Sequence, residues 1–588
     1  IMVDKMVHDY TIPSIDVARN AFVRNHTWKG TCDSGLLYPI FFDETLPGDT
    51  KQLNTTVFGR LSTPFVPVLD NIYLDVHYFY CPMRILWDNA KKFFGERKNP
   101  NDSIDFMVPT INSGETGFTP CGFFDCLGVP PSVADLTLSS VVFYARAYNK
   151  IWNEWYRSEI LQESVDEITG DTGDEESIYP LLPRGKRQDY FTSGFTSSQK
   201  GSASTVPLVM NDTTAPVYGN GKKLQLQTYN GSSYSRGYIG NYFDRDYDGT
   251  LYCSSTYVPI RTASTAASLP SSSNTFLSTQ FSTANGDNDV LAVTNNAQGT
   301  LSPTSHANLY ALGVSTDKAN SGLIADLSVL TNPTINSLRQ AIAIQQFLER
   351  DMFSGTRYRE LVLSHYGVHI PDYTVQVPEY LGGGTVRVNI NPVAQTSSTD
   401  STTPQGNLAA TGTVAGSDIG FTHSFDEHGV ILGLASFRTD ITYQQGVDRH
   451  FLRNTRYDYF FPSLAHLGMQ SVTNKEIYAQ GDSVVDSDSS IIDNKTFNYN
   501  MRYDEYRFKN SYVTGKFRSS YPQSLDVWHL AENFANLPVF NDEFIKVSDT
   551  VKRVVAVQDE PEFLLDVYHD YTDVREVPMY GLPGLTRI

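Results

Sequence analysis

The sequence predicts a mostly β protein, an antiparallel sandwich in which the connecting loops outweigh the strands. Three observations support this prediction. Segments in which side chains alternate with a two-residue period stand near both ends of the chain, long polar insertions separate them, and strands do not alternate regularly with helices. We therefore expect the two ends of the 588-residue chain to share one sheet system.

The strand signal is clearest in three segments. In residues 71–80 (NIYLDVHYFY), Leu74 and Val76 fall on one face and the residues between them on the other, as a strand requires. The same alternation returns in residues 430–441 and 563–571. Pro-Gly turn signals separate the early strands, so these segments are expected to be distinct strands.

Two segments have helical periodicity instead. Aromatic side chains recur at three- and four-residue spacing through 139–162, which is typical of an amphipathic helix. A second helix is predicted for 333–353, where Asn332 can cap the first turn, Pro333 suits the first helical position and Gly355 can end the helix. We expect both helices to pack on a sheet.

Residues 193–322 differ in composition from the rest of the chain. Of these 130 residues, 60 are Ser, Thr, Asn or Gly and only 14 are charged. The segment also contains many tyrosines, so it can bury some surface and is expected to form a small, mostly β subdomain. A second Ser/Thr-rich stretch, 395–420, lacks aromatic residues and is predicted to be a mobile loop.

Composition disfavours several classes of function. The chain has 45 Lys and Arg against 65 Asp and Glu, a net charge of -20, which argues against a dedicated, freely diffusing DNA-binding module. No apolar run is long enough to cross a membrane. The five cysteines form no C-x-x-C pair, so neither a disulfide framework nor a structural zinc site is expected.

Catalytic and cofactor motifs are also weak. No nucleotide-binding P-loop, zinc-protease or serine-hydrolase motif is present. His365 and His369 could share a helix face, but no nearby carboxylate or Cys completes a metal set. The Gly382–Gly384 run favours a flexible turn over a phosphate-binding loop. We predict a protein that is not an enzyme, with no cofactor and no metal.

Basic residues interleaved with aromatic residues form three local clusters that oppose the acidic total. Arginine and lysine can contact phosphates while rings stack on bases, as single-stranded nucleic acid binding requires. The same residues could equally pair with carboxylates or lie at subunit contacts. The second cluster contains Arg449, Arg453 and Arg456. The candidate DNA contacts come from the other two clusters. The first cluster supplies Arg184, Lys186 and Arg187 and continues into Tyr190 and Phe191. The third cluster, 502–518, which includes Tyr512, supplies Arg502, Arg507, Lys509, Lys516 and Arg518.

Several long strings resemble the major capsid protein of the Microviridae, small icosahedral single-stranded DNA phages, and specifically of its gokushovirus branch. The resemblance covers most of the chain in the expected order and fails mainly in 200–330. The strings include TCDSGLLYPIFFDETLPGDT (31–50), LDNIYLDVHYFYCPMRILWDNAKKFFGE (69–96), RAYNKIWNEWYR (146–157), PRGKRQDYFTS (183–193), FLERDMFSGTRYRELVLSHYGV (347–368), PEYLGGGTVRVNINPVAQTS (378–397), LAHLGMQSVTNKEIYAQG (464–481), TGKFRSSYPQSLDVWHLAENF (514–534) and MYGLPGLTRI (579–588).

The resemblance implies a viral-capsid type antiparallel jelly roll of eight strands with long loop insertions and a few helices. It divides the chain into 1–199 and 326–588, which hold the jelly-roll strands, and 200–325, an insertion that stands out from the shell at the three-fold axes and contacts the host. The candidate receptor contacts in the insertion are Tyr229, Tyr234, Tyr238, Tyr242 and Tyr247.

The resemblance also implies the partners and the location. Copies of the chain assemble into the smallest icosahedral shell (T=1) around a circular single-stranded DNA genome. Further expected partners are a small basic DNA-packaging protein, an internal scaffolding protein, a pilot protein and a receptor on the bacterial host surface, with no membrane. The expected location is the virion, after assembly in the host cytoplasm.

Two other functions remain open at this point. A cell-surface adhesin or carbohydrate-binding jelly roll would use the Tyr-rich insertion to stack on sugars and would be monomeric. A β-sandwich hydrolase would need two carboxylates in one cleft, which a chain with 65 acidic residues can always supply in principle.

Overall fold

The computed structural model describes residues 18–201, 335–400, 404–548 and 550–580. It also gives the backbone course of nine short strands between 214 and 326. Contacts divide the chain into two units, residues 1–203 with 345–588 and residues 204–344. None of the helices in the described ranges combines the length and apolarity that a membrane crossing requires.

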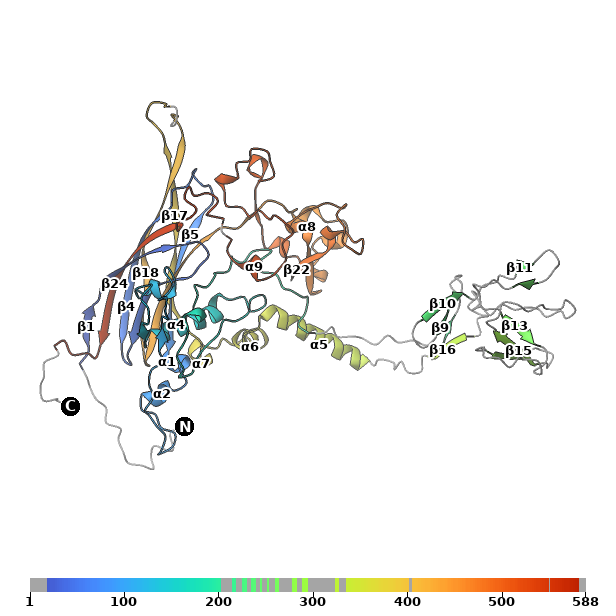
Figure 1. Ribbon diagram of the computed structural model, residues 1–588, viewed down its shortest axis with the longest axis horizontal. Coiled ribbons are helices and arrows are strands. Elements are labelled where there is room, and N and C mark those ends of the chain that lie inside the picture. Colours follow the sequence, from blue (N-terminus) through green and yellow to red (C-terminus); the bar gives the residue numbers. More distant parts are fainter. Residues whose placement is uncertain are drawn as a thin grey trace. The chain divides into compact units, whose positions relative to one another are not determined.

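The first unit is built on one continuous antiparallel sheet of nine strands, whose two halves we call the β24 sheet and the β19 sheet (Figure 1). The β24 sheet has the order β1/β2-β24-β4-β18, with β1 Asn20–Val23, β2 His26–Cys32, β24 Phe563–Arg575, β4 Thr50–Leu61 and β18 Leu408–Ser424. The β19 sheet has the order β3-β19-β5-β17, with β3 Tyr38–Thr45, β19 Gly429–Thr439, β5 Ile72–Pro82 and β17 Glu379–Ala394. Both β1 and β2 pair with β24, so they act as one bent strand.

The eight strands form the predicted jelly roll. The strands from β2 to β5, and again β18, β19 and β24, alternate between the two halves of the sheet along the chain. Strand β17 joins them, because its residues 379–387 pair with β5 and its residues 388–394 pair with β18. The predicted strands at 71–80, 430–441 and 563–571 correspond to β5, β19 and β24. The two ends of the chain share one sheet, as expected.

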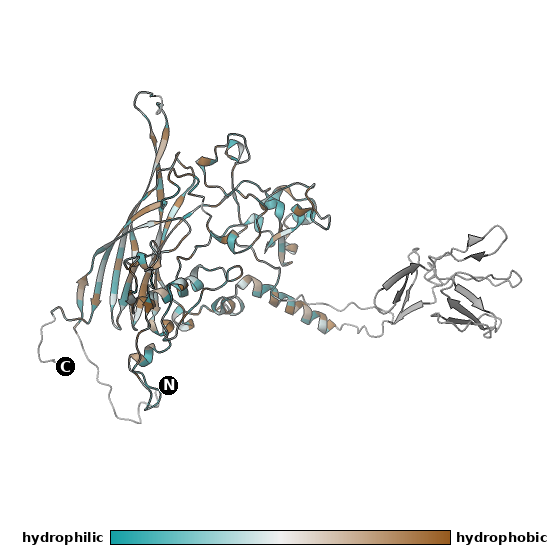
Figure 2. Cartoon of the chain, viewed as in Figure 1, coloured by the Kyte–Doolittle hydropathy of each residue, from teal (hydrophilic) through white to brown (hydrophobic). Residues whose placement is uncertain are grey.

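Burial along the strands shows which faces are covered. In β4 every second residue is buried, so one face packs on the core and the other is open, and Figure 2 shows the mixed hydropathy of such strands. In β19 all residues from Gly429 to Arg438 are buried. The second face of β19 is covered by α4 (Val141–Ile151), whose Val142 and Tyr148 join one apolar cluster with Val430 and Leu432.

The predicted helix at 139–162 is confirmed in its first part. Helix α4 continues into a π-helical turn, Trp152–Tyr156, and then the backbone becomes extended at Arg157. The helix is fixed to the sheet because the Tyr148 hydroxyl donates to the Leu37 carbonyl and accepts from the Leu182 amide. As predicted, this helix packs on a sheet.

The second predicted helix exists as α5, Ile335–Ser354, followed by Gly355 with φ +86°. Its expected packing on a sheet is wrong. Among its described side chains only Met352 is buried, and Leu338 and Ile342 are exposed.

Two long segments connect strands of the jelly roll. Residues 83–378, between β5 and β17, include α1 Met83–Leu86, α2 Ala90–Phe93, β6 Ile111–Asn112, α3 Phe123–Cys126, β7 Thr137–Leu138, a 3-10 helix Glu176–Ile178, α6 Tyr358–Tyr366 and α7 Asp372–Val375. The same segment contains the second unit, whose strands are β8 Thr214–Val217, β9 Gln225–Tyr229, β10 Tyr234–Tyr238, β11 Asp244–Arg245, β12 Leu251–Tyr252, β13 Ile260–Ala263, β14 Ser278–Ser282, β15 Asn288–Val293 and β16 Leu323–Asp326.

The other connection, residues 440–562 between β19 and β24, has little regular structure. Its strands and helices are β20 Thr442–Tyr443, β21 Met469–Thr473, α8 Asn474–Ile477, β22 Thr496–Met501, β23 Ser511–Tyr512 and α9 Asp542–Ile545. Its 3-10 helices are Arg449–Phe451, Arg456–Asp458, Pro462–Leu464, Ile492–Asn494, Asp504–Tyr506, Gly515–Phe517 and Asp526–Trp528. It has its own small core, in which Tyr190 and Phe191 pack with Tyr443 and Val472.

The prediction of a mobile loop over 395–420 is wrong from residue 408 onward, where β18 begins. Small residues are required there because the neighbouring strands approach closely. A Cβ atom on Gly420 would lie 1.9 Å from the Leu53 carbonyl oxygen, and one on Gly416 would lie 2.5 Å from the Val386 side chain. The Gly382–Gly384 run, predicted as a flexible turn, likewise lies inside β17.

A buried group of charges joins the two sheets. Lys51 on β4 is fully buried, and its Nζ lies 2.6 Å from Asp43 on β3 and 3.2 Å from Asp573 on β24. Asp49, Arg24 and Arg575 complete the group, so three carboxylates face three cations. An unpaired charge at this depth would be strongly destabilising, and the pairing removes that cost.

A directed chain of hydrogen bonds makes a second link between the sheets. The Nε2–H of His569 donates to the Ile40 carbonyl at 3.1 Å, which leaves Nδ1 to accept from Thr55 at 3.0 Å. The Thr55 hydroxyl therefore accepts from Tyr78 at 2.6 Å. This series of hydrogen bonds requires a neutral His569 imidazole. Burial, aided by the neighbouring His26, keeps it neutral by lowering the pKa of His569 to about 4.

Acid should therefore destabilise the folded subunit. Burial and the Arg184 charge also lower the pKa of His77 to about 4, from an ordinary value near 6.5. As the pH falls, His77 and His569 take up protons in the unfolded chain before they do so in the folded subunit. Their contribution to the free energy of unfolding is therefore fully present above pH 6.5 and decreases as the pH drops toward 4. Each histidine contributes about 1.4 kcal/mol per pH unit in that window. Denaturant unfolding of wild type and His77→Gln from pH 6.5 to 4.5 should give a steeper loss for wild type. Equal slopes would contradict the buried neutral state of His77.

Candidate nucleic-acid interface

The segment 440–562 carries exposed rings beside exposed cations. The β21–β22 hairpin leads into Tyr503, whose φ of +63° turns the chain into the 3-10 helix Asp504–Tyr506 and directs the following residues to the surface. Rings in this segment are exposed to an unusual degree for large apolar side chains. They are Phe451, Tyr457, Tyr459, Phe460, Phe461, Tyr506, Phe508, Tyr512 and Tyr521.

Two arginines of the second cluster, Arg449 and Arg453, are paired within the subunit rather than projecting freely. Arg453 lies over the Tyr506 ring at 4.6 Å and also pairs with Glu505 at 3.2 Å. Arg449 pairs with Glu476 at 2.9 Å. Arg449 and Arg453 are therefore partly neutralised within the subunit, whereas Arg456 is exposed and lies over the Tyr457 ring at 4.8 Å.

The first cluster is split by the fold. Arg184 pairs with Asp75 at 2.7 Å, and Lys186 is 5% exposed and pairs with Glu532 at 2.8 Å. Arg187 is 56% exposed and lies over the Tyr73 ring. The charges of Arg184 and Lys186 are thus occupied inside the subunit, whereas Arg187 is accessible.

The third cluster supplies the accessible cations. Lys509 is 65% exposed and Arg507 is 54% exposed, although each also contacts one carboxylate. Lys516 is exposed, and among the described residues its amine has no ion-pair partner. Arg502 and Arg518 are half-buried and donate to the carbonyls of Tyr457 and Gln444.

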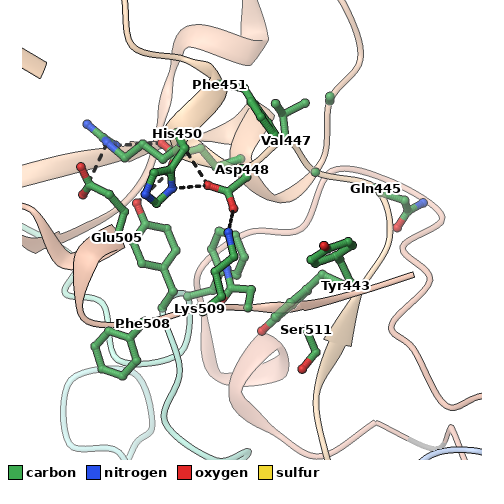
Figure 3. Close-up of a pocket in the computed structure, with 18 of the residues that line it drawn as sticks. Tyr443, Gln445, Val447, Asp448, His450, Phe451, Glu505, Phe508, Lys509 and Ser511 are labelled. Carbon is green, nitrogen blue, oxygen red and sulfur yellow. Dashed lines mark hydrogen bonds and ion pairs between the residues drawn. The ribbon is translucent and has the colours of Figure 1, made fainter. Parts of the chain in front are cut away.

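A cavity of about 610 Å³ opens beside these cations (Figure 3). Its wall brings together residues that are far apart in the sequence, since Tyr190 and Phe191 of the first cluster meet Lys509, Tyr512 and Arg518 of the third. The sequence indicated that both clusters carry basic and aromatic residues, but it gave no sign that they share one cavity.

Asp448 organises the polar side of the cavity. Its carboxylate accepts from the His450 backbone amide at 3.0 Å, contacts the His450 ring at 2.7 Å and pairs with Lys509, as Figure 3 shows. Partial burial opposes ionisation, but the hydrogen bonds from Lys509 and His450 outweigh it and lower the pKa of Asp448 to about 2. The carboxylate is therefore ionised at neutral pH and holds Lys509 at the rim.

Other predicted site residues lie elsewhere. The five candidate receptor tyrosines, Tyr229, Tyr234, Tyr238, Tyr242 and Tyr247, fall outside the residues whose side chains the structure describes. His365 belongs to α6 and contacts Asp351 at 2.7 Å, whereas His369 lies beyond the end of the helix at Gly367, so the two do not share a helix face. Within the described ranges, no three His, Cys, Asp or Glu side chains are grouped to hold a metal ion.

Comparisons with known proteins agree with the fold. Residues 10–585 match the model of a family described as capsid protein (F protein). The chain is 39% identical to capsid protein VP1 of Chlamydia phage 1, over 98% of this chain and 97% of the relative. It is 40% identical to capsid protein VP1 of Bdellovibrio phage phiMH2K, over 97% and 96%. It is 30% identical to capsid protein VP1 of Spiroplasma virus 4, over 99% and 98%. The chain therefore belongs to the F-protein family of phage capsid proteins.

Proposed function

We propose that this protein is the major capsid subunit of a small icosahedral phage, and that copies of it close into a T=1 shell around a circular single-stranded DNA genome. The observation that carries the genome contact is the group of exposed cations and rings on segment 440–562, together with Arg187. Phosphates would lie on Lys509, Arg507 and Lys516, and bases on the neighbouring rings.

Charge distribution supports a local contact of this kind. With a net charge of -20, the average surface repels DNA, so binding requires a site where cations outnumber accessible carboxylates. A shell subunit can use such a weak local site effectively, because many copies act on one enclosed strand. This arrangement favours the capsid function over a monomeric adhesin, which has no need of exposed cations next to rings.

Further partners belong to the same proposal. A small basic DNA-packaging protein would bind under the shell, an internal scaffolding protein would hold subunits during assembly in the host cytoplasm, and a pilot protein would accompany the genome. The subunit itself has a structural role and no catalytic one, and it acts in the virion.

Genome packaging provides the test of the DNA contact. Lys509→Gln combined with Lys516→Gln should yield intact particles with less DNA, because two phosphate contacts per subunit are lost. The plot of the logarithm of the DNA-binding constant against the logarithm of the salt concentration should also become less steep, by roughly 1.4 for the two lost contacts. The measurement is the ratio of absorbance at the nucleic-acid and protein maxima in purified particles.

Lys29→Gln is the matched control, since Lys29 is 68% exposed and lies on β2 outside this surface. It should leave the DNA content unchanged. Normal packaging in the double variant would remove segment 440–562 from the genome contact.

We further propose that the insertion 200–325 contacts the host receptor through its tyrosines. Its composition, rich in small polar residues and tyrosine, suits an adaptable binding surface. Deleting residues 225–300 should leave shell assembly intact and abolish attachment of particles to host cells. A deletion mutant that assembles and still infects would place host attachment elsewhere on the subunit.

A further inference from the structure

We propose that the 610 Å³ cavity at segment 440–562 receives a single unstacked base of the enclosed single-stranded DNA. The inference rests on the proposed genome contact and assigns a specific task to the cavity. A space of this size is within the range that holds nucleotide-sized ligands. Exposed Lys509 lines the cavity and exposed Arg507 precedes it by two residues, so a strand held by them would pass its mouth.

Aromatic rings line the cavity at two depths. Phe451 and Tyr512 are 83% and 70% exposed, so they can stack on an incoming base without rearrangement of the core. Phe191 and Tyr443 are buried behind them and contact each other edge to face. An exposed ring above a rigid apolar wall is the arrangement that stacking on a base requires, and it tolerates any base.

Unpartnered polar groups stand on the same wall. In the described part of the chain, the side chains of Asn510, Ser511 and Thr514 form no hydrogen bond, although all three line the cavity. By contrast, the Tyr443 hydroxyl already donates to Asp189, and Gln445 bonds the Phe534 backbone. An amide and two hydroxyls can donate to and accept from the polar edge of a base.

Electrostatics decide which part of the nucleotide enters. The lining holds the carboxylates of Asp448, Glu476 and Glu505 against an equal number of cations, Arg449, Lys509 and Arg518, so it has no net positive charge to draw a phosphate inside. The most exposed of these cations is Lys509, which ionised Asp448 holds in place, and Arg507 is exposed two residues before it. A neutral base can therefore enter while its phosphates stay outside on Lys509 and Arg507.

The test uses the full-chain subunit and two probes, a short oligothymidylate and an abasic oligonucleotide of the same length. At fixed low salt, Tyr512→Ala should weaken binding of the oligothymidylate about tenfold and leave binding of the abasic strand unchanged. Tyr512→Phe, which retains the ring, should bind like wild type. Tyr521→Ala removes an exposed ring outside the cavity and should have no effect.

The outcomes separate the base pocket from the genome contact. If Tyr512→Ala, with an unchanged unfolding midpoint, affects both probes equally or neither, the base pocket is refuted while the cationic contact stands. If wild-type subunit binds neither probe, the genome contact itself fails and the pocket with it. A cryo-electron microscopy map of filled particles with polypeptide density in the cavity would show a peptide site instead and overturn the assignment of a base.

Discussion

The jelly roll depends on one buried lysine. Lys51 lies where the first and last strands of the chain meet, and its contacts with Asp43 and Asp573 tie the β19 sheet to the β24 sheet. Because the Lys51 charge is fully enclosed, removing one of its carboxylate partners would leave an uncompensated buried charge and destabilise the fold. The group thus holds β3, β4 and β24 together, and β24 is the strand to which segment 440–562 returns.

This framework allows function to reside in the connections. Segment 440–562 leaves β19 and returns to β24, so both its ends are anchored in the core while its middle forms a small separate core with Tyr190 and Phe191. The exposed rings and cations are mounted on that small core. Irregular backbone is suitable here, because it can present rings at angles that a flat strand face cannot.

The sequence predicted the parts of the fold that depend on local pattern. The alternation in β5, β19 and β24 and the aromatic spacing of α4 reflect faces buried within the same subunit. The predictions failed where the residue type is set by a contact with a part of the chain that is far away in the sequence. Gly416 and Gly420 resemble loop residues, yet they are small because Val386 and Leu53 lie against them. The apolar stripe of α5 predicted that one face of this helix is buried, but among its described side chains only Met352 is buried.

The candidate site was predictable only in part, for the same reason. Basic and aromatic composition drew attention to these segments, but it could not separate Lys186, which is enclosed beside Glu532, from Lys509, which is accessible. Nor could it indicate that Tyr190 and Tyr512 line one cavity, since only the folded chain brings residues 322 positions apart together. Unpartnered polar groups such as Asn510 are visible only in a structure.

The central claim is closed self-assembly, and the mass and symmetry of the purified native species test it most directly. Electron cryo-microscopy combined with light scattering on particles from infected cells should show a uniform T=1 icosahedral shell that encloses DNA. A stable monomer or small oligomer at high concentration, with all assembly partners present, would contradict the account and favour an adhesin.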